Sequence, residues 1–344
     1  DPVLIGAGDI AGCGSTPKDA ETAAILAAHP TATVFTLGDN AYPNGTAAEY
    51  ANCYDPTWGA HKSRTRPSIA DHDIGTGSPQ PYLNYFAAQL APFAPTATDP
   101  TKMYYSYNLG AWHVVHLNAV CFYYTPGCSV PAQEAWLRAD LAANPNMCTV
   151  MMMSSPRFSS GNVHGPNPDM QGYWDIAYQA GVDLVLSGDD HIYERFAPMD
   201  ASGAPDPQFG VRQMVVGTGG YLMYEIGTVQ PNSQVRYAQD FGVLKLTLHP
   251  TSYDFQFIPI NGQPSPDTGT ANCHGAPNGT PVEGAPAVRS SSAASANYAS
   301  SSLTIAKPAG TAAGDVLLAT ATHQGGSGYT LTPPAGWTAV PNGD

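Results

Sequence analysis

Short apolar runs alternate with helical patterns over about the first 200 residues of the chain. The segments 19–28, 133–143 and 169–180 have the composition and apolar spacing of helices. Five other runs are too short and too rich in β-branched residues for helices, and they predict buried strands at residues 3–7, 33–37, 66–69, 149–153 and 182–186. Strands that alternate with helices in this way predict an α/β domain.

Strand patterns replace the helices from about residue 213 onward. The segments 213–219, 241–249 and 252–260 predict strands, and the last two alternate apolar and polar side chains over most of their length. A series of strands after βα units indicates two packed sheets with helices on their outer faces. We therefore expect a four-layer α/β/β/α sandwich of two mixed sheets over residues 1–261.

The remaining residues have a different composition. Residues 262–300 are rich in Gly, Pro, Ser and Ala without apolar periodicity, which predicts a linker. Residues 301–344 contain three strand-like runs, which predict a short β-rich tail. Three strands make a poor independent core. The tail is expected either to complete a sheet, with the main domain or in a homo-oligomer, or to be the start of a longer β-sandwich module.

Chemically useful side chains follow each of the five apolar runs in the first half. In an open α/β sheet the carboxyl ends of the strands converge on one crevice, so these side chains should meet there. A cluster of carboxylates with few nearby cations needs a metal ion or protons to neutralise it. The residues that point to a metal centre are Asp9, Asp39, Tyr42, Asp71, Ser154, Asp189 and His191.

These segments occur in an order that resembles a known family. They read GD at 8–9, GDNAY at 38–42, ADHD at 70–73, SSPR at 154–157 and SGDDH at 187–191. The series resembles the motifs of the calcineurin-like metallophosphoesterases over roughly residues 3–275. The tyrosine three residues after the second aspartate is typical of the purple acid phosphatase branch. The resemblance implies the sandwich described above and the hydrolysis of a phosphate ester by metal-activated hydroxide.

The resemblance also implies a first metal site whose residue types are all present. Asp9, Asp39, Tyr42 and His191 match the four ligands that the family uses there. Tyrosinate and carboxylate ligands suit a hard trivalent ion, so Fe(III) or another hard ion is expected in this site.

The second metal site that the resemblance implies departs from the family's pattern. Asp39 would bridge to it, but Asp71 stands where the family has asparagine. Ser154 and Asp189 both stand where the family has histidine. An all-oxygen ligand set favours Mn²⁺, Mg²⁺ or Ca²⁺ over Zn²⁺. Either such an ion occupies the second site, or the site is vacant and its carboxylates share protons.

Two histidines are candidate catalytic residues. His72 matches the family's histidine that contacts the phosphate or protonates the leaving group. His164, ten residues after Ser154, either faces the substrate in the same way or belongs to a glycine-rich turn. Asp73 is expected to orient His72 or its loop, or to cap a turn. Residues 193–195 (Tyr-Glu-Arg) are expected to form an internal ion pair rather than to contact substrate.

Charge and cysteine content limit the partners and the compartment. The formal charge of −14 provides no electrostatic footprint for nucleic acid or for an anionic membrane. No stretch of about 18 apolar residues predicts a membrane span. Six cysteines without CxxC spacing favour disulfides in an oxidising compartment, and thus a secreted protein. Cys121 with Cys128 and Cys13 with Cys53 are possible pairs, although sequence alone does not fix the pairing.

Two functions therefore compete. The first is a secreted phosphate ester hydrolase similar to purple acid phosphatases, with the first metal site intact and the second degenerate, so that activity is weak or altered. The second is a catalytically inactive protein of the same fold, with a structural, binding or self-assembly role on the cell exterior. In the first case a small phosphate ester is the partner.

Overall fold

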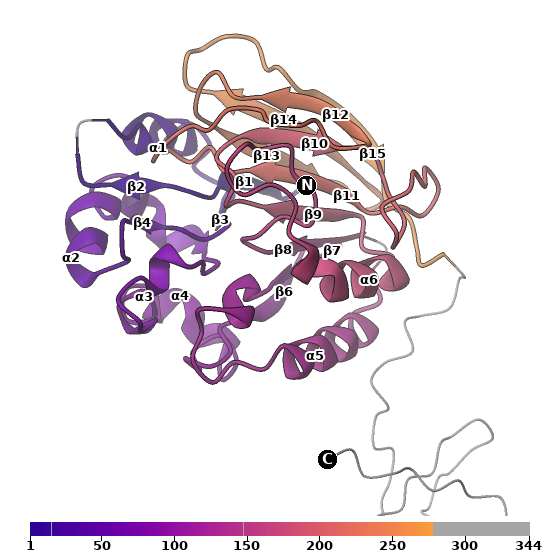
Figure 1. Cartoon of the computed structure of the whole chain (residues 1–344), viewed down its shortest axis with the longest axis horizontal. Coiled ribbons are helices and arrows are strands. Elements are labelled where there is room, and N and C mark those ends of the chain that lie inside the picture. Colours follow the sequence, from indigo (N-terminus) through magenta and orange to yellow (C-terminus); the bar gives the residue numbers. More distant parts are fainter. Residues whose placement is uncertain (15, 147, 278–344) are drawn as a thin grey trace, which may run out of the picture. The chain divides into compact units, whose positions relative to one another are not determined.

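Two mixed β-sheets packed face to face form the centre of the computed structural model, which describes residues 1–14, 16–146 and 148–277 (Figure 1). In spatial order, sheet 1 consists of β15 (Thr268–Asn272), β14 (Ser252–Pro259), β13 (Gly242–Leu248), β1 (Val3–Ala7), β3 (Thr33–Thr36) and β5 (Thr65–Arg66). Sheet 2 consists of β12 (Ser233–Tyr237), β10 (Tyr193–Phe196), β11 (Arg212–Val216), β9 (Leu184–Ser187), β8 (Cys148–Met152), β7 (Trp112–His116) and β6 (Tyr105–Leu109). The α/β/β/α expectation is confirmed.

Parallel pairing within each sheet sets the position of the functional side chains. In sheet 1, β1 and β3 pair in parallel, as do β3 and β5. In sheet 2, β7, β8, β9 and β11 are parallel to one another, whereas the flanking β6 and β10 are antiparallel. The carboxyl ends of these strands therefore lie at one edge of each sheet. The short strands β2 (Ala11–Gly12) and β4 (Ala41–Tyr42) pair with each other just beyond that edge of sheet 1.

The apolar residues of sheet 2 divide between two cores according to the alternation of a strand. One set faces sheet 1, and the next residue along each strand faces the outer helices. The inner set includes Val114, Val150, Met152, Leu184 and Leu186, which share a core with Leu4, Val34 and Leu244 of sheet 1. The outer set, which packs with Leu137, Tyr173 and Trp174 of the helices, includes Val115, Met151, Met153 and Val185.

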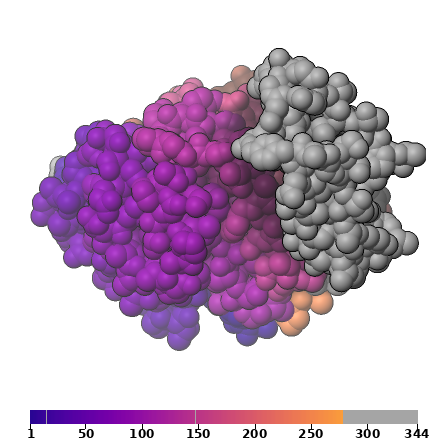
Figure 2. Space-filling view, turned by 90° about the horizontal axis from the view of Figure 1, so that it is seen from below, coloured from indigo at the N-terminus to yellow at the C-terminus, as the bar shows by residue number. Residues whose placement is uncertain are grey.

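Helices cover the outer faces of the sandwich. The α5 helix (Val130–Ala143) and the α6 helix (Gln171–Ala180) lie side by side against sheet 2 (Figure 1). The α1 helix (Asp19–Ala27) packs near β13, and the shorter helices α2 (Ala47–Glu49), α3 (Gln80–Tyr85) and α4 (Ala87–Leu90) lie in the chain between β4 and β6. Seen from below, violet and magenta segments of the chain make up much of the visible surface (Figure 2).

Three sequence-based boundaries were wrong. The strand expected at residues 66–69 ends at Arg66, because Pro67 has no N–H for the ladder. The α5 helix begins three residues before the predicted Gln133, since Ser129 caps it by accepting a hydrogen bond from the N–H of Ala132. The linker expected from residue 262 begins too early, because β15 pairs with β14 and extends sheet 1.

Three disulfides are present among the described residues. Cys13 is bonded to Cys53 and Cys121 to Cys128, as the sequence allowed, and Cys148 is bonded to Cys273. The third bond attaches the segment after β15 to the first residue of β8. Within the described ranges no helix is long and apolar enough to span a membrane. The β-rich tail at 301–344 and its role in an oligomer fall outside the described residues.

Candidate metal centre

The centre lies where the carboxyl edges of the two sheets meet. The N–H of Gly8, directly after β1, donates a hydrogen bond to the carbonyl of Val216 at the end of β11, over 2.9 Å. A Cβ on Gly188, after β9, would lie 2.8 Å from Oδ2 of Asp9, so a glycine is needed for this close approach. The two sheets thus present their terminal loops to one another, as the strand pattern predicted.

Three aspartates in these loops have a left-handed backbone. The φ angles are 61° for Asp9, 50° for Asp39 and 70° for Asp189. Aspartate tolerates this region better than most residues, but it is uncommon and tends to occur at functional sites. Each aspartate lies two or three residues beyond its strand, where the chain turns sharply and brings the carboxylate toward the other loops.

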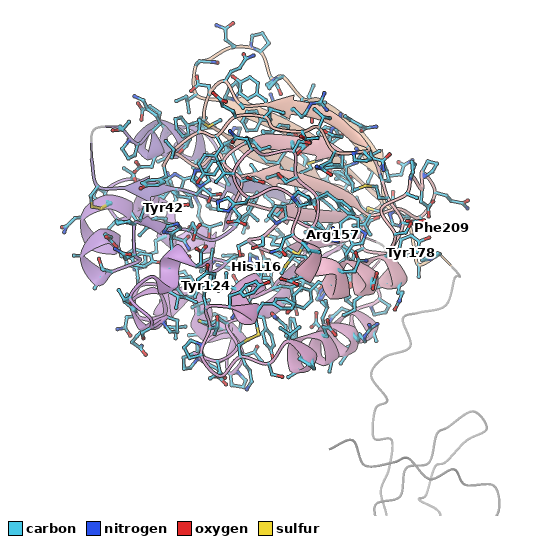
Figure 3. The ribbon with its side chains drawn as sticks, viewed as in Figure 1. Tyr42, His116, Tyr124, Arg157, Tyr178 and Phe209 are labelled. Carbon is cyan, nitrogen blue, oxygen red and sulfur yellow. A yellow bond between two sulfur atoms is a disulfide. The ribbon has the colours of Figure 1, made fainter. Side chains whose placement is uncertain are left out.

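The four residues predicted for the first metal site meet at the hydroxyl of Tyr42. The hydroxyl oxygen of Tyr42 lies 2.9 Å from Oδ1 of Asp9 and 3.0 Å from Oδ2 of Asp39. It also lies 3.2 Å from Nε2 of His191, which is itself 3.2 Å from Oδ1 of Asp9. All four side chains are buried. Figure 3 shows Tyr42 at the end of the molecule opposite Tyr178 and Phe209.

The donor set of this group fits a cation. Nδ1 of His191 lies 2.9 Å from the carbonyl oxygen of Leu222, which accepts but cannot donate, so the Nδ1 atom carries the proton. In the neutral ring, Nε2 then points a lone pair at Tyr42 and Asp9, as a metal-binding histidine does. When both carboxylates are ionised, the single phenolic proton of Tyr42 cannot satisfy them and this nitrogen together. A positive ion would.

The charges of the group perturb one another strongly. Burial, and then the charges of Asp71 and Asp9, raise the pKa of Asp39 well above its usual value. Burial, and then the charges of Asp39 and Asp9, raise the pKa of Tyr42 in the same way. Burial opposes the ionisation of Asp9, but His191 outweighs it and lowers the pKa of that carboxyl. The shifts of Asp39 and Tyr42 reflect the crowding of negative charge in a buried place, whereas that of Asp9 reflects its contact with His191.

A second group of oxygen atoms adjoins the first. Asp39, Asp71 and Asp189 each place a carboxylate oxygen within 4.8 Å of the other two. The N–H of Asp189 donates a 3.0 Å hydrogen bond to Oδ2 of Asp9, which links the two groups. Burial raises the pKa of Asp189 to about 7 against the opposing effect of His164. Three of the four residues expected at the second metal therefore come together.

Ser154, the fourth residue expected there, is buried at the end of β8. Its carbonyl accepts a 2.8 Å hydrogen bond from the N–H of Gly188, next to Asp189. Within the described part of the chain, the hydroxyl oxygen of Ser154 has no hydrogen-bond partner. A buried hydroxyl without a protein partner is compatible with a bound ion or water at this position.

Both candidate catalytic histidines lie beside these groups. The N–H of His72 donates a 2.9 Å hydrogen bond to Oδ1 of Asp39, and its ring lies 4.4 Å from that of Tyr42. Nδ1 of His72 is 2.6 Å from the carbonyl of Pro43, which leaves Nε2 free. Nε2 of His164 lies 3.9 Å from Oδ1 of Asp189, and its side chain is 44% exposed. The N–H of His164 also donates a 3.1 Å hydrogen bond to Oδ1 of Asp190, so the substrate-facing role and the role in the turn both stay predictions.

Asp73 orients the loop that carries Asp39. Its carboxylate accepts hydrogen bonds from the N–H and the side-chain amide of Asn40, both at 3.0 Å, and from the N–H of Ala70 at 3.0 Å. The hydroxyl of Tyr50 donates a fourth, at 2.6 Å. Burial raises the pKa of Asp73 to about 6. Asp73 thus binds the backbone of its own loop at Ala70 and, in addition to what was predicted, the backbone and side chain of Asn40 beside Asp39.

The segment after His191 has a structural role. Arg195 Nε lies 2.7 Å from Oδ2 of Asp267, so the expected internal ion pair is confirmed. Glu194 is buried and instead accepts hydrogen bonds from Ser160.

Sequence analysis missed two tyrosines that stack on the ligand candidates. The ring of Tyr221 lies parallel to that of Tyr42, at 3.7 Å and 3°, and a Cβ on Gly12 would lie 2.7 Å from its other side. The ring of Tyr224 stacks on His191 at 4.1 Å and 13°. No spacing rule predicts these contacts. The glycine-rich turn that ends at Gly220 is the one sequence signal that the chain approaches another segment closely here.

Comparisons with known proteins agree with this picture. Purple acid phosphatase 21 of Arabidopsis thaliana is 31% identical over 188 residues, which cover 50% of this chain and 41% of the relative. Purple acid phosphatase 18 of the same plant is 26% identical over 169 residues, 48% of this chain and 35% of the relative. The matched regions thus span less than half the length of these relatives. No protein-family model matches the chain.

Solved structures show the same fold. A purple acid phosphatase from yellow lupin (Lupinus luteus) has a TM-score of 0.60 at 17% identity, over 79% of this chain and 54% of its own. A dimetal phosphatase from Danio rerio has a TM-score of 0.53 at 12% identity, over 78% of this chain and 99% of its own. A Plasmodium protein described as the anchor in the inner membrane complex has a TM-score of 0.60 at 14% identity, over 80% of this chain and 90% of its own. The fold is that of the calcineurin-like metallophosphoesterases, and part of the chain is similar in sequence to purple acid phosphatases.

Proposed function

We propose that the chain is a secreted phosphate ester hydrolase similar to purple acid phosphatases, with an altered second metal site. The observation that carries the proposal is the contact of Tyr42 with Asp9, Asp39 and His191, in which one phenolic proton faces three acceptors. Sequence similarity to purple acid phosphatases supports the reaction class. The three disulfides support an oxidising, extracellular compartment.

Two kinds of ion suit the two groups of ligands. Asp9, Asp39, Tyr42 and His191 would hold Fe(III) or another hard ion, because phenolate and carboxylate are hard ligands. The oxygen set Asp39, Asp71 and Asp189, with the hydroxyl of Ser154, would hold Mg²⁺, Mn²⁺ or Ca²⁺ rather than Zn²⁺. When bound, the ions supply the positive charge that polarises a phosphate ester and activates water.

The side chains around the ions have separate roles. Nε2 of His72 is free to bind a phosphate oxygen or to give a proton to the leaving group, because Nδ1 is held by the carbonyl of Pro43. His164, half exposed beside Asp189, would act in the same way from the opposite loop. Asp73 keeps Asp39 in its left-handed conformation by binding the backbone of Asn40.

The first test is spectroscopic. Protein loaded with Fe(III) should be coloured, because a tyrosinate–iron(III) pair absorbs visible light. Tyr42→Phe should abolish the colour. Tyr105→Phe is the matched control, since it removes another buried hydroxyl, which binds the carbonyl of Pro67 away from the centre. A colourless wild-type protein with no bound iron would remove the proposed first site.

The second test is catalytic. Hydrolysis of an aryl phosphate is measured after addition of Mn²⁺, Mg²⁺, Ca²⁺ or Zn²⁺. We expect slow turnover that Mn²⁺ or Mg²⁺ supports better than Zn²⁺ does. The triple change Asp71→Asn, Ser154→His and Asp189→His should raise the rate with Zn²⁺, because it supplies the amide and imidazole ligands that Zn²⁺ prefers. No turnover with any ion, before and after this change, would rule out the hydrolase.

A non-catalytic role is the second candidate. It is favoured by the structural likeness to the Plasmodium anchor protein, 90% of which is covered. In that case the protein would bind metal for stability or assembly but would hydrolyse no phosphate ester. The two assays separate the candidates, because metal binding without turnover by the wild type or by the restored variant supports this one.

A further inference from the structure

Exposed apolar side chains lie in loops at the edge of sheet 2 that carries Asp189 and His191. Among the described residues, the exposed large apolar side chains are Tyr123, Tyr124, Val163, Leu222 and Val229. All five lie in loops that follow the carboxyl ends of β7, β8 and β11. These strands and β9, which leads to Asp189 and His191, are parallel neighbours, so their loops share one edge of sheet 2. The rest of the described surface carries no such side chain at a comparable exposure.

Three apolar residues of this edge are fixed next to the ligand candidates. Gly161 and Ile226 form an antiparallel bridge, and the N–H of Asn162 donates a 3.1 Å hydrogen bond to the carbonyl of Glu225. Val163 directly follows Asn162, and the N–H of Tyr224 donates a 3.0 Å hydrogen bond to the carbonyl of His191. Leu222 lies two residues before Tyr224 in the same loop.

Contacts with the centre are direct on both segments. The ring of Tyr224 stacks on His191 at 4.1 Å, and the carbonyl of Leu222 accepts the hydrogen bond from Nδ1 of His191. The ring of His164, next to Val163, lies 5.7 Å from that of Tyr224. Val163 and Leu222 are 54% and 47% exposed, so their side chains are available to a ligand.

We propose that Val163, Leu222 and Tyr224 form a binding subsite for an apolar group attached to phosphorus, so that the preferred substrates are phosphate esters of aromatic or aliphatic alcohols. The inference rests on the proposed function, because the metal centre must hold the phosphate. Three side chains offer an apolar surface that suits a group of about the size of a phenyl ring. A protein partner would need about 800 Å² on each side, which three side chains do not supply.

The test compares the binding of two inert ligands to the metal-loaded full chain. Methylphosphonate and phenylphosphonate carry the same head group and differ in the apolar part. Calorimetry should show that phenylphosphonate binds about tenfold more tightly, since part of the ring leaves water. The double variant Val163→Ser and Leu222→Ser should lose most of this ratio, with the Kd for methylphosphonate unchanged. Val229→Ser, 50% exposed on the same segment, is the control and should keep the ratio.

Each result bears on the subsite. Equal affinities in the wild type, no binding of either ligand, or a ratio that survives the double variant would overturn it. Should the double variant fail to fold, the wild-type ratio and Leu222→Ser alone decide. Hydrolysis of phenyl phosphate is measured separately. Selective binding without turnover would defeat the hydrolase and keep the subsite, whereas turnover without selectivity would defeat the subsite alone.

Discussion

Removal of one charge from the second group of carboxylates should have opposite effects with and without a metal ion. Asp71→Asn is the smallest such change, because it keeps the shape of the side chain. One oxygen of each of Asp39, Asp71 and Asp189 lies within 4.8 Å of the others. At an effective dielectric constant of about 20, two unit charges at that distance repel by about 3.5 kcal/mol.

Solvent reduces this value for Asp71. The side chain of Asp71 is only half-buried, and its neighbours Asp39 and Asp189 retain protons for part of the time. We therefore expect Asp71→Asn to raise the free energy of unfolding of the metal-free protein by about 1–2 kcal/mol. With a divalent ion the sign reverses. An ion at about 100 times its Kd stabilises the wild type by about 2.7 kcal/mol, and the loss of an anionic ligand weakens that binding.

The measurement is urea unfolding at about pH 8, once with a chelator and once with Mg²⁺ or Ca²⁺ in excess. Asp240→Asn is the matched control, because Asp240 is also half-buried but receives a hydrogen bond from the adjacent Phe241 N–H. This control should change the free energy of unfolding by no more than about 0.5 kcal/mol, both with the chelator and with the ion. Two outcomes would refute this prediction. In one, Asp71→Asn destabilises the metal-free protein; in the other, the ion raises the free energy of unfolding of the wild type and of Asp71→Asn by the same amount.

Three further predictions concern residues around the centre and in the core. Burial lowers the pKa of His116 to about 3, so below about pH 6.5 the unfolded chain binds a proton that the native protein does not, and the free energy of unfolding falls as the pH falls. In urea unfolding, His116→Phe should reduce this pH dependence by up to about 1.4 kcal/mol per pH unit between about pH 6.5 and 4.5. An unchanged slope would contradict this prediction. Tyr221→Ala should weaken iron(III) binding about tenfold and shift the absorption of the bound ion. Tyr221→Phe, which keeps the ring stacked on Tyr42, should change neither the affinity nor the absorption. Equal effects of the two variants would argue against the idea that Tyr221 positions Tyr42. Asp267→Asn leaves the largely buried Arg195 without its counter-ion and should cost about 3 kcal/mol in chemical denaturation, against less than about 1 kcal/mol for Glu21→Gln in an exposed pair.

The meeting of the candidate metal ligands could be predicted from the sequence because its signal is local to each strand. An apolar run followed by an acidic residue places that residue at a strand end, and parallel strands bring such ends together without further information. Asp9, Asp39 and His191 were predictable in this way. Their left-handed turns were not, because aspartate is common in ordinary turns as well.

Contacts that cross the fold were beyond the reach of sequence patterns. Tyr221 lies 179 positions after Tyr42, the ring on which it stacks, and neither residue has a spacing that indicates the other. The same holds for β15, whose sequence TGTAN resembles a polar linker. It is a strand because β14 offers a free edge and because Cys148 binds the adjacent Cys273.

The geometry of the second group argues for retention of a cation there. Loss of function removes the selection for precise placement, so carboxylates in an abandoned site would be expected to turn toward solvent and away from one another. Instead Asp189 is held in a left-handed conformation, and its N–H binds Asp9 while its carboxylate faces Asp39 and Asp71. This arrangement combines backbone strain with charge repulsion, two unfavourable contributions that a bound divalent ion would offset. The proposal of an oxygen-ligated second ion therefore explains a cost that a vacant site would leave uncompensated.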